Sequence, residues 1–289
     1  GVSFYFKRRG AFDTSFLRKS PPRTLSEPLL GREILEATEP AVRAVWITAA
    51  NPVAMLPDSA SVARALETRD LVVVVDSFLT DTARRAHLVL PTTTLVEDDD
   101  LLGAYGNHWL GASVPVVAPP PGVRSDLQIV QALAAEIDRR SGPGGESISP
   151  KIAGTAKEWK ARILRKVEPL GLTVERLERE SVRNPLAPTI LFEKGRFPTS
   201  SGRMRLLTDL PAPPAEEPGY PLWLFSSSTE RSQCSQWAGE PPALLEATCH
   251  PDAAPGLPDG ARVVVESAIG SLDARLRLDP SQRPDVVIV

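Results

Sequence analysis

The chain has 289 residues, of which 42% are hydrophobic and 24% charged, and this balance indicates a globular rather than a disordered protein. Its formal net charge of -3 and the lack of a long basic run argue against nucleic acid as the principal partner. The length allows about two domains, and no apolar stretch approaches the roughly 20 residues that a membrane-spanning helix needs.

The two cysteines, Cys234 and Cys249, are too few to form an iron–sulfur or zinc site alone. A disulfide between them is possible, but the chain otherwise resembles a reduced, cytoplasmic protein. The chain opens at Gly1 and closes on "DVVIV", which reads as an interrupted strand. Both ends look cut, so we expect a partial chain, and a periplasmic location stays open.

The first third of the chain alternates apolar runs with helix-like stretches. Buried strands are predicted at residues 44–49, 71–75 and 87–90, because uniformly apolar runs are typical of strands covered on both faces. Asn51-Pro52 predicts a turn, and helices are predicted at residues 59–68 and 80–86. This spacing indicates a parallel sheet with right-handed crossovers.

A longer helix is predicted next, with an apolar face on one side. It spans Ser125–Asp138, and its face comprises Leu127, Val130, Leu133, Ala134 and Ile137. Residues 139–160 read as a linker, and residues 159–179 as helical.

The last third of the chain has a β-like composition. Residues 197–211 predict a turn at Ser201-Gly202 between strand-like pieces, followed by a proline-rich connector at 211–221. Three alternating segments then follow: "PLWLFSSS", "GARVVVES" and "GSLDARLRL". They predict a small β-barrel or sandwich.

Asp76 comes directly after the second predicted strand. Ligands of open α/β sheets bind beyond the carboxyl ends of the parallel strands. A carboxylate there can accept hydrogen bonds from a ribose diol, or from N1–H and the amino group of guanine. The alternative is that Asp76 caps the next short helix.

Other polar segments also allow two interpretations. Ser77, Thr80 and Thr82 either bond phosphates or cap a helix. "SSSTERSQCSQW" at 226–237 is either a cluster of side-chain turns or a clamp for phosphate and base. "EDDD" at 97–100 is typical of a solvated turn rather than a Mg²⁺ site, since adjacent carboxylates fix no geometry. Neither a GxGxxG fingerprint nor a P-loop is present.

"VWITAANPVAMLPD" followed by "DLVVVVDSFLTDTARRAHLVLPTTTLVEDD" resembles the central region of molybdopterin oxidoreductases, the enzymes of the formate dehydrogenase, nitrate reductase and DMSO reductase type. "FPTSSGRMRLL" is similar to the family's segment that leads into its last domain. "LFSSSTERSQCSQW" resembles the loop of that domain that lies over the cofactor, and "CHPDAAPGLPDGARVVVES" resembles a signature of the same domain. The resemblance covers residues 44–289. His87 departs from it, since aspartate is common there, and we do not expect this to affect the cofactor.

The resemblance implies α/β architecture: a Rossmann-like parallel sheet followed by a double-psi-type β-barrel, incomplete at its end. It implies a preceding-domain tail at 1–40, a Rossmann-like domain at 41–140, a linker at 141–210 and the barrel at 211–289. It also implies a guanine dinucleotide pocket, with Asp76 as the contact to guanosine. The further cofactor-binding residues would be Asn51, Pro52, Ser77, Phe78, Thr80, Thr82, Ser228, Ser235 and Gln236.

By the same resemblance, the chain is the cofactor-binding portion of a molybdenum or tungsten bis-pterin guanine dinucleotide oxidoreductase. The metal ligand and the iron–sulfur cysteines are expected in a missing N-terminal part, so we assign no catalytic or metal-ligating residue here. The expected partners are that missing part or electron-transfer subunits, and a small redox substrate. The alternative is a non-catalytic subunit of an electron-transfer complex whose homologous domain has lost the cofactor.

Overall fold

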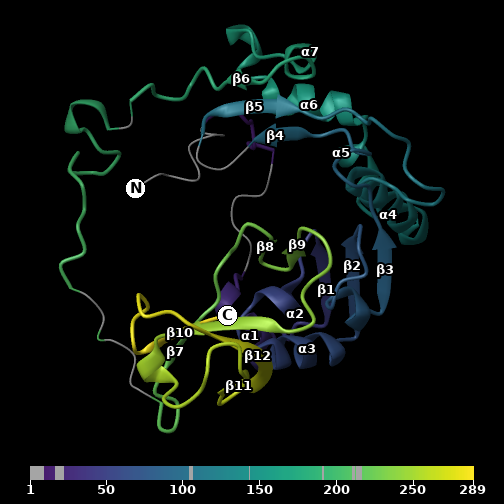
Figure 1. Ribbon diagram of the computed structural model, residues 1–289. Coiled ribbons are helices and arrows are strands. Elements are labelled where there is room, and N and C mark those ends of the chain that lie inside the picture. The colour runs from purple at the N-terminus through teal and green to yellow at the C-terminus, as the bar shows by residue number, and fades with distance from the viewer. Residues whose placement is uncertain are drawn as a thin grey trace. The chain divides into compact units, whose positions relative to one another are not determined.

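The computed structural model describes residues 10–16, 23–103, 107–142, 144–190, 192–209, 212 and 217–289. Figure 1 shows the chain and labels most of its helices and strands. The architecture is mixed α/β, as predicted. The chain divides into two compact units. The first comprises Gly1–Leu25, Arg43–Ala50 and Asp70–Arg205, and the second Ser26–Val42, Asn51–Arg69 and Leu206–Val289.

A three-stranded parallel sheet lies in the first unit. Its strands are β1 (Ala44–Thr48), β2 (Leu71–Asp76) and β3 (Leu88–Pro91), in the order β1-β2-β3. The four central valines of β2 are at most 5% exposed, in agreement with the prediction that this apolar run forms a buried strand. The three predicted strands and their parallel pairing are confirmed. The third is shifted by one residue from the predicted 87–90, because it begins at Leu88 and Pro91 still pairs with Asp76.

The residues after β2 form less helix than the sequence predicts. Only the 3-10 turn η3 (Ala83–Arg85) is present in place of the helix predicted over 80–86. Thr80 lies before this turn and contacts its first residues, since its Oγ1 accepts a hydrogen bond from the N–H of Ala83 at 3.1 Å and its carbonyl accepts one from the N–H of Arg84 at 3.0 Å. The intervening backbone is therefore left as a loop at the carboxyl end of the sheet.

The first unit also contains an antiparallel sheet that the sequence pattern does not predict. It consists of β4 (Leu101–Gly103), β5 (Trp109–Ala112) and β6 (Val182–Arg183), in the order β4-β5-β6. A hydrophobic core joins β5 and β6 to the helices α6 (Ala156–Leu164) and α7 (Val174–Leu177). Ala11, fully buried, belongs to this core, so residues 10–16 form part of the first unit.

Helix α4 (Asp126–Ser141) confirms the longest predicted helix. A capping box fixes its start, with the Ser125 hydroxyl accepting from the N–H of Gln128 and the Gln128 side chain accepting from the N–H of Ser125. The predicted apolar face is only partly right. Ala134 is buried together with Ile129, whereas three of its members are more than 40% exposed: Val130, Leu133 and Ile137.

The segment from 139 to 179 also differs from the expectation. The predicted linker at 139–160 contains the end of α4, the short helix α5 (Ser149–Ile152) and the start of α6. The helix expected over 159–179 is split into α6, the 3-10 turn η4 (Glu168–Leu170) and α7. Pro169 and Gly171, which has a φ of +82°, explain this break.

Three short helices belong to the second unit, together with the turn η2 (Glu27–Leu29). They are α1 (Leu30–Glu36), α2 (Pro52–Met55) and α3 (Ser59–Glu67). Helix α3 confirms the prediction at 59–68, and Asp58 caps it by accepting a hydrogen bond from the N–H of Ser61 at 3.1 Å. Helices α1 and α3 approach closely at Gly31, where an added Cβ would lie 2.5 Å from the Val62 nitrogen.

The second unit also holds a curled five-stranded sheet. Its order is β11-β12-β10-β13-β7. The strands are β7 (Trp223–Phe225), β10 (Leu245–Cys249), β11 (Arg262–Ser267), β12 (Gly270–Leu278) and β13 (Val286–Ile288). The antiparallel β11–β12 hairpin confirms the predicted strands, whereas β10 pairs in parallel with β12. The turn η6 (Pro251–Ala253) follows β10.

The segment at 192–209 contains the predicted turn without the strands. The N–H of Phe197 donates to the Gly202 carbonyl at 3.1 Å, and Gly202 has a φ of +67°. Apart from the 3-10 turn η5 (Glu193–Gly195), the described residues here form neither helix nor strand. Much of the predicted connector at 211–221 lies outside the described residues. Within the described ranges, no helix combines the length and apolar character needed to cross a membrane.

Candidate functional site

The carboxyl end of β2 presents a carboxylate that is held in place. Asp76, the last residue of β2, is half-buried. Its Oδ1 accepts a hydrogen bond from the N–H of Phe78 at 2.9 Å. Asp76 therefore closes a local turn two residues on and does not cap the next helix. The other carboxylate oxygen has no protein partner within the described part of the chain, which leaves it able to accept from a ligand.

Ser77 ties the loop after β2 to the loop after β3. Its Oγ lies 3.0 Å from the Thr92 carbonyl oxygen and 3.1 Å from that of Thr93, and donates to this pair. The single hydroxyl hydrogen is thus committed to the backbone, and only the lone pairs of Oγ remain for a ligand.

The other predicted residues of this loop have different environments. The Phe78 side chain is 72% exposed, whereas Thr82 is fully buried. The Thr80 hydroxyl accepts from the N–H of Ala83, which is the capping role of the alternative interpretation. The end of β2 and the loop after it therefore contain both kinds of residue. Asp76 keeps one carboxylate oxygen for a ligand, whereas the Thr80 hydroxyl is used within the protein.

Two further residues of this region are not predicted from the sequence. Thr92 is 8% exposed, and its Oγ1 donates to Oδ2 of Asp126 at 2.9 Å. Thr92 also forms an isolated β-bridge with Arg124. Asp126 is the first residue of α4, so Thr92 connects the loops at the sheet edge to that helix. The available signal was a run of threonines directly after a predicted strand.

Asn51 and Pro52 lie in the second unit and open a one-turn helix. The Asn51 carbonyl accepts from the N–H groups of Ala54 and Met55, each at 3.0 Å, and Pro52 is the first residue of α2. The expected turn is therefore the N-terminus of a short helix, where proline is favoured because no N–H partner is lost. The Asn51 side chain is 6% exposed and does not cap α2.

The remaining predicted residues of the second unit surround a small hairpin. Strands β8 (Ser232–Gln233) and β9 (Gln236–Trp237) are joined by a turn that contains Ser235. The Thr229 hydroxyl accepts from the N–H groups of Arg231 at 3.1 Å and Ser232 at 3.0 Å, so this loop contains a side-chain turn. Ser228, which precedes the hairpin, and Gln236, the first residue of β9, are exposed.

The carboxylates of the acidic run at 97–100 accept hydrogen bonds from nearby backbone N–H groups or form an ion pair. Glu97 accepts from the N–H and hydroxyl of Thr94, at 2.8 and 2.9 Å. Asp98 and Asp100 each accept from the N–H of the following residue. Asp99 forms an ion pair with the buried Lys160. No group of three or more potential metal ligands occurs among the residues with described positions.

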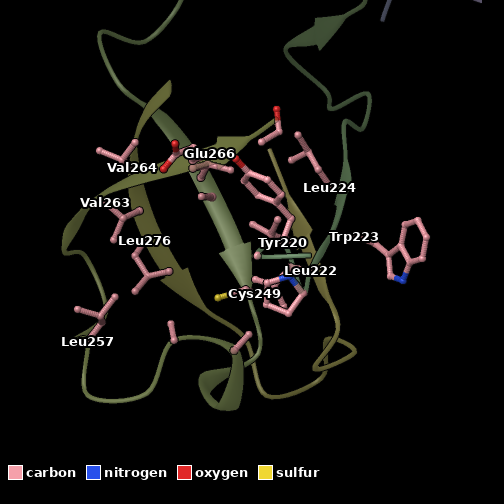
Figure 2. Close-up of a pocket in the computed structure, with 18 of the residues that line it drawn as sticks. Tyr220, Leu222, Trp223, Leu224, Cys249, Leu257, Val263, Val264, Glu266 and Leu276 are labelled. Atoms are coloured by element: carbon pink, nitrogen blue, oxygen red, sulfur yellow. The ribbon is translucent and has the colours of Figure 1, made fainter. Parts of the chain in front are cut away.

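A cavity of about 570 Å³ lies in the second unit against the curled sheet (Figure 2). Apolar side chains such as Leu222, Val263 and Leu276 line it, together with the thiol of Cys249. Burial raises the pKa of that thiol, which favours the neutral, unreactive form. No lysine or arginine occurs among its described lining residues, so the cavity is poorly suited to a phosphate.

Comparison with known proteins identifies one family over part of the chain. Residues 24–136 match the family model described as molybdopterin oxidoreductase. "Probable oxidoreductase YyaE" of Bacillus subtilis (strain 168) is 26% identical over 288 residues, which covers 90% of this chain and 41% of that protein. An NADH-quinone oxidoreductase subunit of Rhizobium meliloti (strain 1021) is 28% identical over 81% of this chain and 26% of that protein.

One solved structure has a similar fold. Acetylene hydratase from Pelobacter acetylenicus aligns with a TM-score of 0.64 and 22% sequence identity, over 91% of this chain and 39% of that chain. The chain spans about two fifths or less of the length of each of these proteins.

Proposed function

Because residues 24–136 match the family model described as molybdopterin oxidoreductase, we propose that this chain is the cofactor-binding portion of a molybdenum or tungsten oxidoreductase. The cofactor proposed is a bis-molybdopterin guanine dinucleotide. When bound, it supplies the metal that changes oxidation state while the substrate gains or loses oxygen or hydride. The residues of this chain bind and orient it.

The observation that carries this proposal is the carboxylate of Asp76. It follows a parallel strand, one of its oxygens is fixed by the N–H of Phe78, and the other has no protein partner among the described residues. Guanine offers two adjacent donors, N1–H and the exocyclic amino group, which suit a carboxylate acceptor. The exposed ring of Phe78 supports a neighbouring stacking contact with the base.

The other predicted residues have assigned parts in the proposal. We propose that Thr80 and the lone pairs of Ser77 line the nucleotide side. Thr82, Asn51 and Pro52 stay proposed for the nucleotide, but they are buried, so they would shape its surroundings from within the protein rather than bond to it. In the second unit, the polar groups proposed to approach the pterin or the phosphates are those of Ser228, which precedes the hairpin, and of Ser235 and Gln236 within it.

The proposal extends to the rest of the protein. We propose that the curled sheet is the double-psi-type barrel domain of the family, and that the metal ligand and the iron–sulfur cysteines lie in a preceding part. Electron-transfer subunits are the expected partners, and the two free thiols, Cys234 and Cys249, support a reducing, cytoplasmic location. The substrate depends on residues outside this chain.

Production of the full-length protein tests this proposal. We expect molybdenum or tungsten in the purified protein and guanosine monophosphate (GMP) after acid hydrolysis. Asp76→Asn keeps the shape but replaces one acceptor oxygen with an amide donor that faces the guanine donors. It should lower the bound GMP at least tenfold, while the exposed Asp81→Asn should not. Absence of both metals and of GMP from the unaltered protein would exclude the proposal.

A second candidate function rests on the similarity to the NADH-quinone oxidoreductase protein of Rhizobium meliloti. In this case the chain is a structural part of an electron-transfer complex and binds no pterin cofactor. The protein would then purify without GMP, and Asp76→Asn would leave its assembly and activity unchanged.

A further inference from the structure

The loop that carries Asp76 is bound to its surroundings by a chain of side-chain and backbone contacts. The Asp76 carbonyl accepts from the N–H of Thr92 at 3.4 Å, and the Ser77 hydroxyl donates to the carbonyls of Thr92 and Thr93. Thr92 in turn donates its hydroxyl to Asp126 at the start of α4. All of these residues belong to the first unit.

The contacts of Ser77 restrict the backbone on which the Asp76 carboxylate depends. Asp76 reaches the N–H of Phe78 only while the intervening peptide units keep their turn. Ser77 is the residue between them, and its hydroxyl fixes that turn to the loop after β3. Without this bond, the turn can rotate and the free carboxylate oxygen loses its fixed direction.

We infer that Ser77 and Thr92 are positioning residues that orient the Asp76 carboxylate toward the guanine of the bound cofactor. The inference rests on the proposed function, because it assumes that Asp76 contacts the guanine. Ser77 acts through its donated hydrogen bond. Thr92, which is 8% exposed, acts from within the protein, through Asp126.

Because Thr92 is buried, it can position the loop but cannot contact the bound cofactor directly. A buried hydroxyl that already donates to Asp126 has no access to a ligand at the sheet edge. If Thr92 and Ser77 act on the same loop, their substitutions are coupled, and the double variant costs less than the sum of the two single variants. Independent ligand contacts would give additive effects.

The experiment follows the first-order loss of metal and GMP from the purified full-length holoenzyme during extended dialysis. Ser77→Val removes the hydroxyl and Ser77→Thr keeps it in a side chain of the same shape. We expect Ser77→Val to accelerate the loss about fivefold, as for one hydrogen bond of about 1 kcal/mol, and Ser77→Thr to restore a rate near that of the unaltered protein. Thr92→Val should accelerate the loss by a similar factor.

Controls separate this role from general destabilisation. Ser141 also donates its hydroxyl to a backbone carbonyl, that of Ile137 at 2.9 Å, at the exposed end of α4. Ser141→Val should leave the rate of cofactor loss unchanged. Melting temperatures of the apo forms identify any variant that is merely unstable, and Ser77→Ala replaces Ser77→Val if the larger side chain prevents folding.

The outcomes are distinguishable. Faster loss in Ser77→Val, rescue by Ser77→Thr and a sub-additive double variant support the inference. Equal rates in Ser77→Val and Ser77→Thr, or additive effects of Ser77→Val and Thr92→Val, overturn it while Asp76→Asn still loses GMP. No effect of Asp76→Asn overturns the proposed function and this inference with it.

Discussion

The carboxylate of Asp13 is completely buried and lies 3.0 Å from Nζ of Lys166, although 153 positions separate the two residues in the chain. Arg165 forms a second ion pair with the same carboxylate, and the N–H of Ser15 donates to it at 3.0 Å. The N–H of Asp13 donates to the Ile163 carbonyl at 2.7 Å. This cluster attaches residues 10–16 to the end of α6.

The Asp13 cluster predicts a stability that depends on acid pH. The hydrogen bond from the Ser15 backbone, followed by that from Lys166, holds the pKa of the Asp13 carboxyl well below its ordinary value of 3.8. A lowered pKa contributes stability that is fully present above about pH 4 and is lost as the pH falls toward the folded-state value. Asp13→Asn should therefore lower the melting temperature at pH 7 by several degrees, and the difference should shrink below about pH 3.

Thermal melts followed by circular dichroism between about pH 2.5 and pH 7 check this prediction. The exposed Asp81→Asn is the matched control, and its melting curve should follow that of the unaltered protein. A difference between Asp13→Asn and the unaltered protein that stays constant with pH would contradict the assignment.

The close approach of α1 and α3 predicts that Gly31→Ala, which adds a single methyl group, destabilises the protein. A Cβ at position 31 would lie 2.5 Å from the Val62 nitrogen and 2.6 Å from the Ser61 carbonyl carbon. Alanine normally stabilises a helix relative to glycine by about 1 kcal/mol, but here the two helices must separate. Gly31→Ala should lower the free energy of unfolding by about 2 kcal/mol.

Urea unfolding measures this effect. Gly270→Ala is the control, because a Cβ there meets no atom within 4 Å. A neutral or stabilising Gly31→Ala would show that the two helices do not pack this closely.

The buried ammonium of Lys160 predicts strong coupling between three residues. Its side chain is 3% exposed and pairs with Asp99 and, at 3.4 Å, with Glu178. Nζ also donates to the Ser113 carbonyl at 3.3 Å. Lys160→Met leaves two carboxylates beside an apolar group and should lower the free energy of unfolding by about 3 kcal/mol.

A compensated variant distinguishes lost charge pairing from lost packing. Adding Asp99→Asn and Glu178→Gln to Lys160→Met removes both unpaired charges and should recover most of the loss. If the triple variant unfolds as easily as the single one, packing of the lysine stem explains the effect.

The hydrogen bond that His87 accepts predicts that its Nδ1 acceptor contributes more to stability than the rest of the imidazole ring does. Its Nδ1 accepts a hydrogen bond from the N–H of Val72 at 3.0 Å, beside the backbone bond from the His87 N–H to the Val72 carbonyl. His87→Leu leaves the N–H of Val72 without this acceptor and should lower the free energy of unfolding by about 1 kcal/mol. His87→Asp, which keeps an acceptor, should cost less.

Urea titrations of the two His87 variants, with GMP content measured in parallel, make the comparison. Both variants should retain the cofactor, since His87 bonds to the first residues of the parallel sheet rather than to its carboxyl end. Equal destabilisation by leucine and aspartate would exclude the hydrogen bond as the cause.

The local sequence pattern is sufficient to predict those helices and strands that depend only on residues close together in the chain. The valines at 72–75 predict a strand buried on both faces, and the spacing before them predicts parallel pairing. Ser125 and Gln128 lie three residues apart and predict the start of α4. The pattern is misleading for Trp159–Arg179, where Pro169 and Gly171 divide one apparent helix into three parts.

Part of the candidate site is also predictable. The apolar run before Asp76 places this residue at the end of a parallel strand, and the structure confirms that position. The sequence leaves open whether Asp76 caps a helix, and Asp76 instead accepts from the N–H of Phe78. The bond from Ser77 to Thr92 has no signature in the local pattern, because that contact requires β2 and β3 to lie in register.

The sequence by itself determined the composition, the main strands, the longest helix and the resemblance to one family, because these depend on residues close together in the chain. Only the tertiary structure decided which polar groups are used within the protein. Lys160 joins Asp99, and Lys166 joins Asp13, across long separations that periodicity does not encode. A carboxylate's partner depends on which backbone folds against it, so the roles of Asp76 and Asp99 became distinct only in three dimensions.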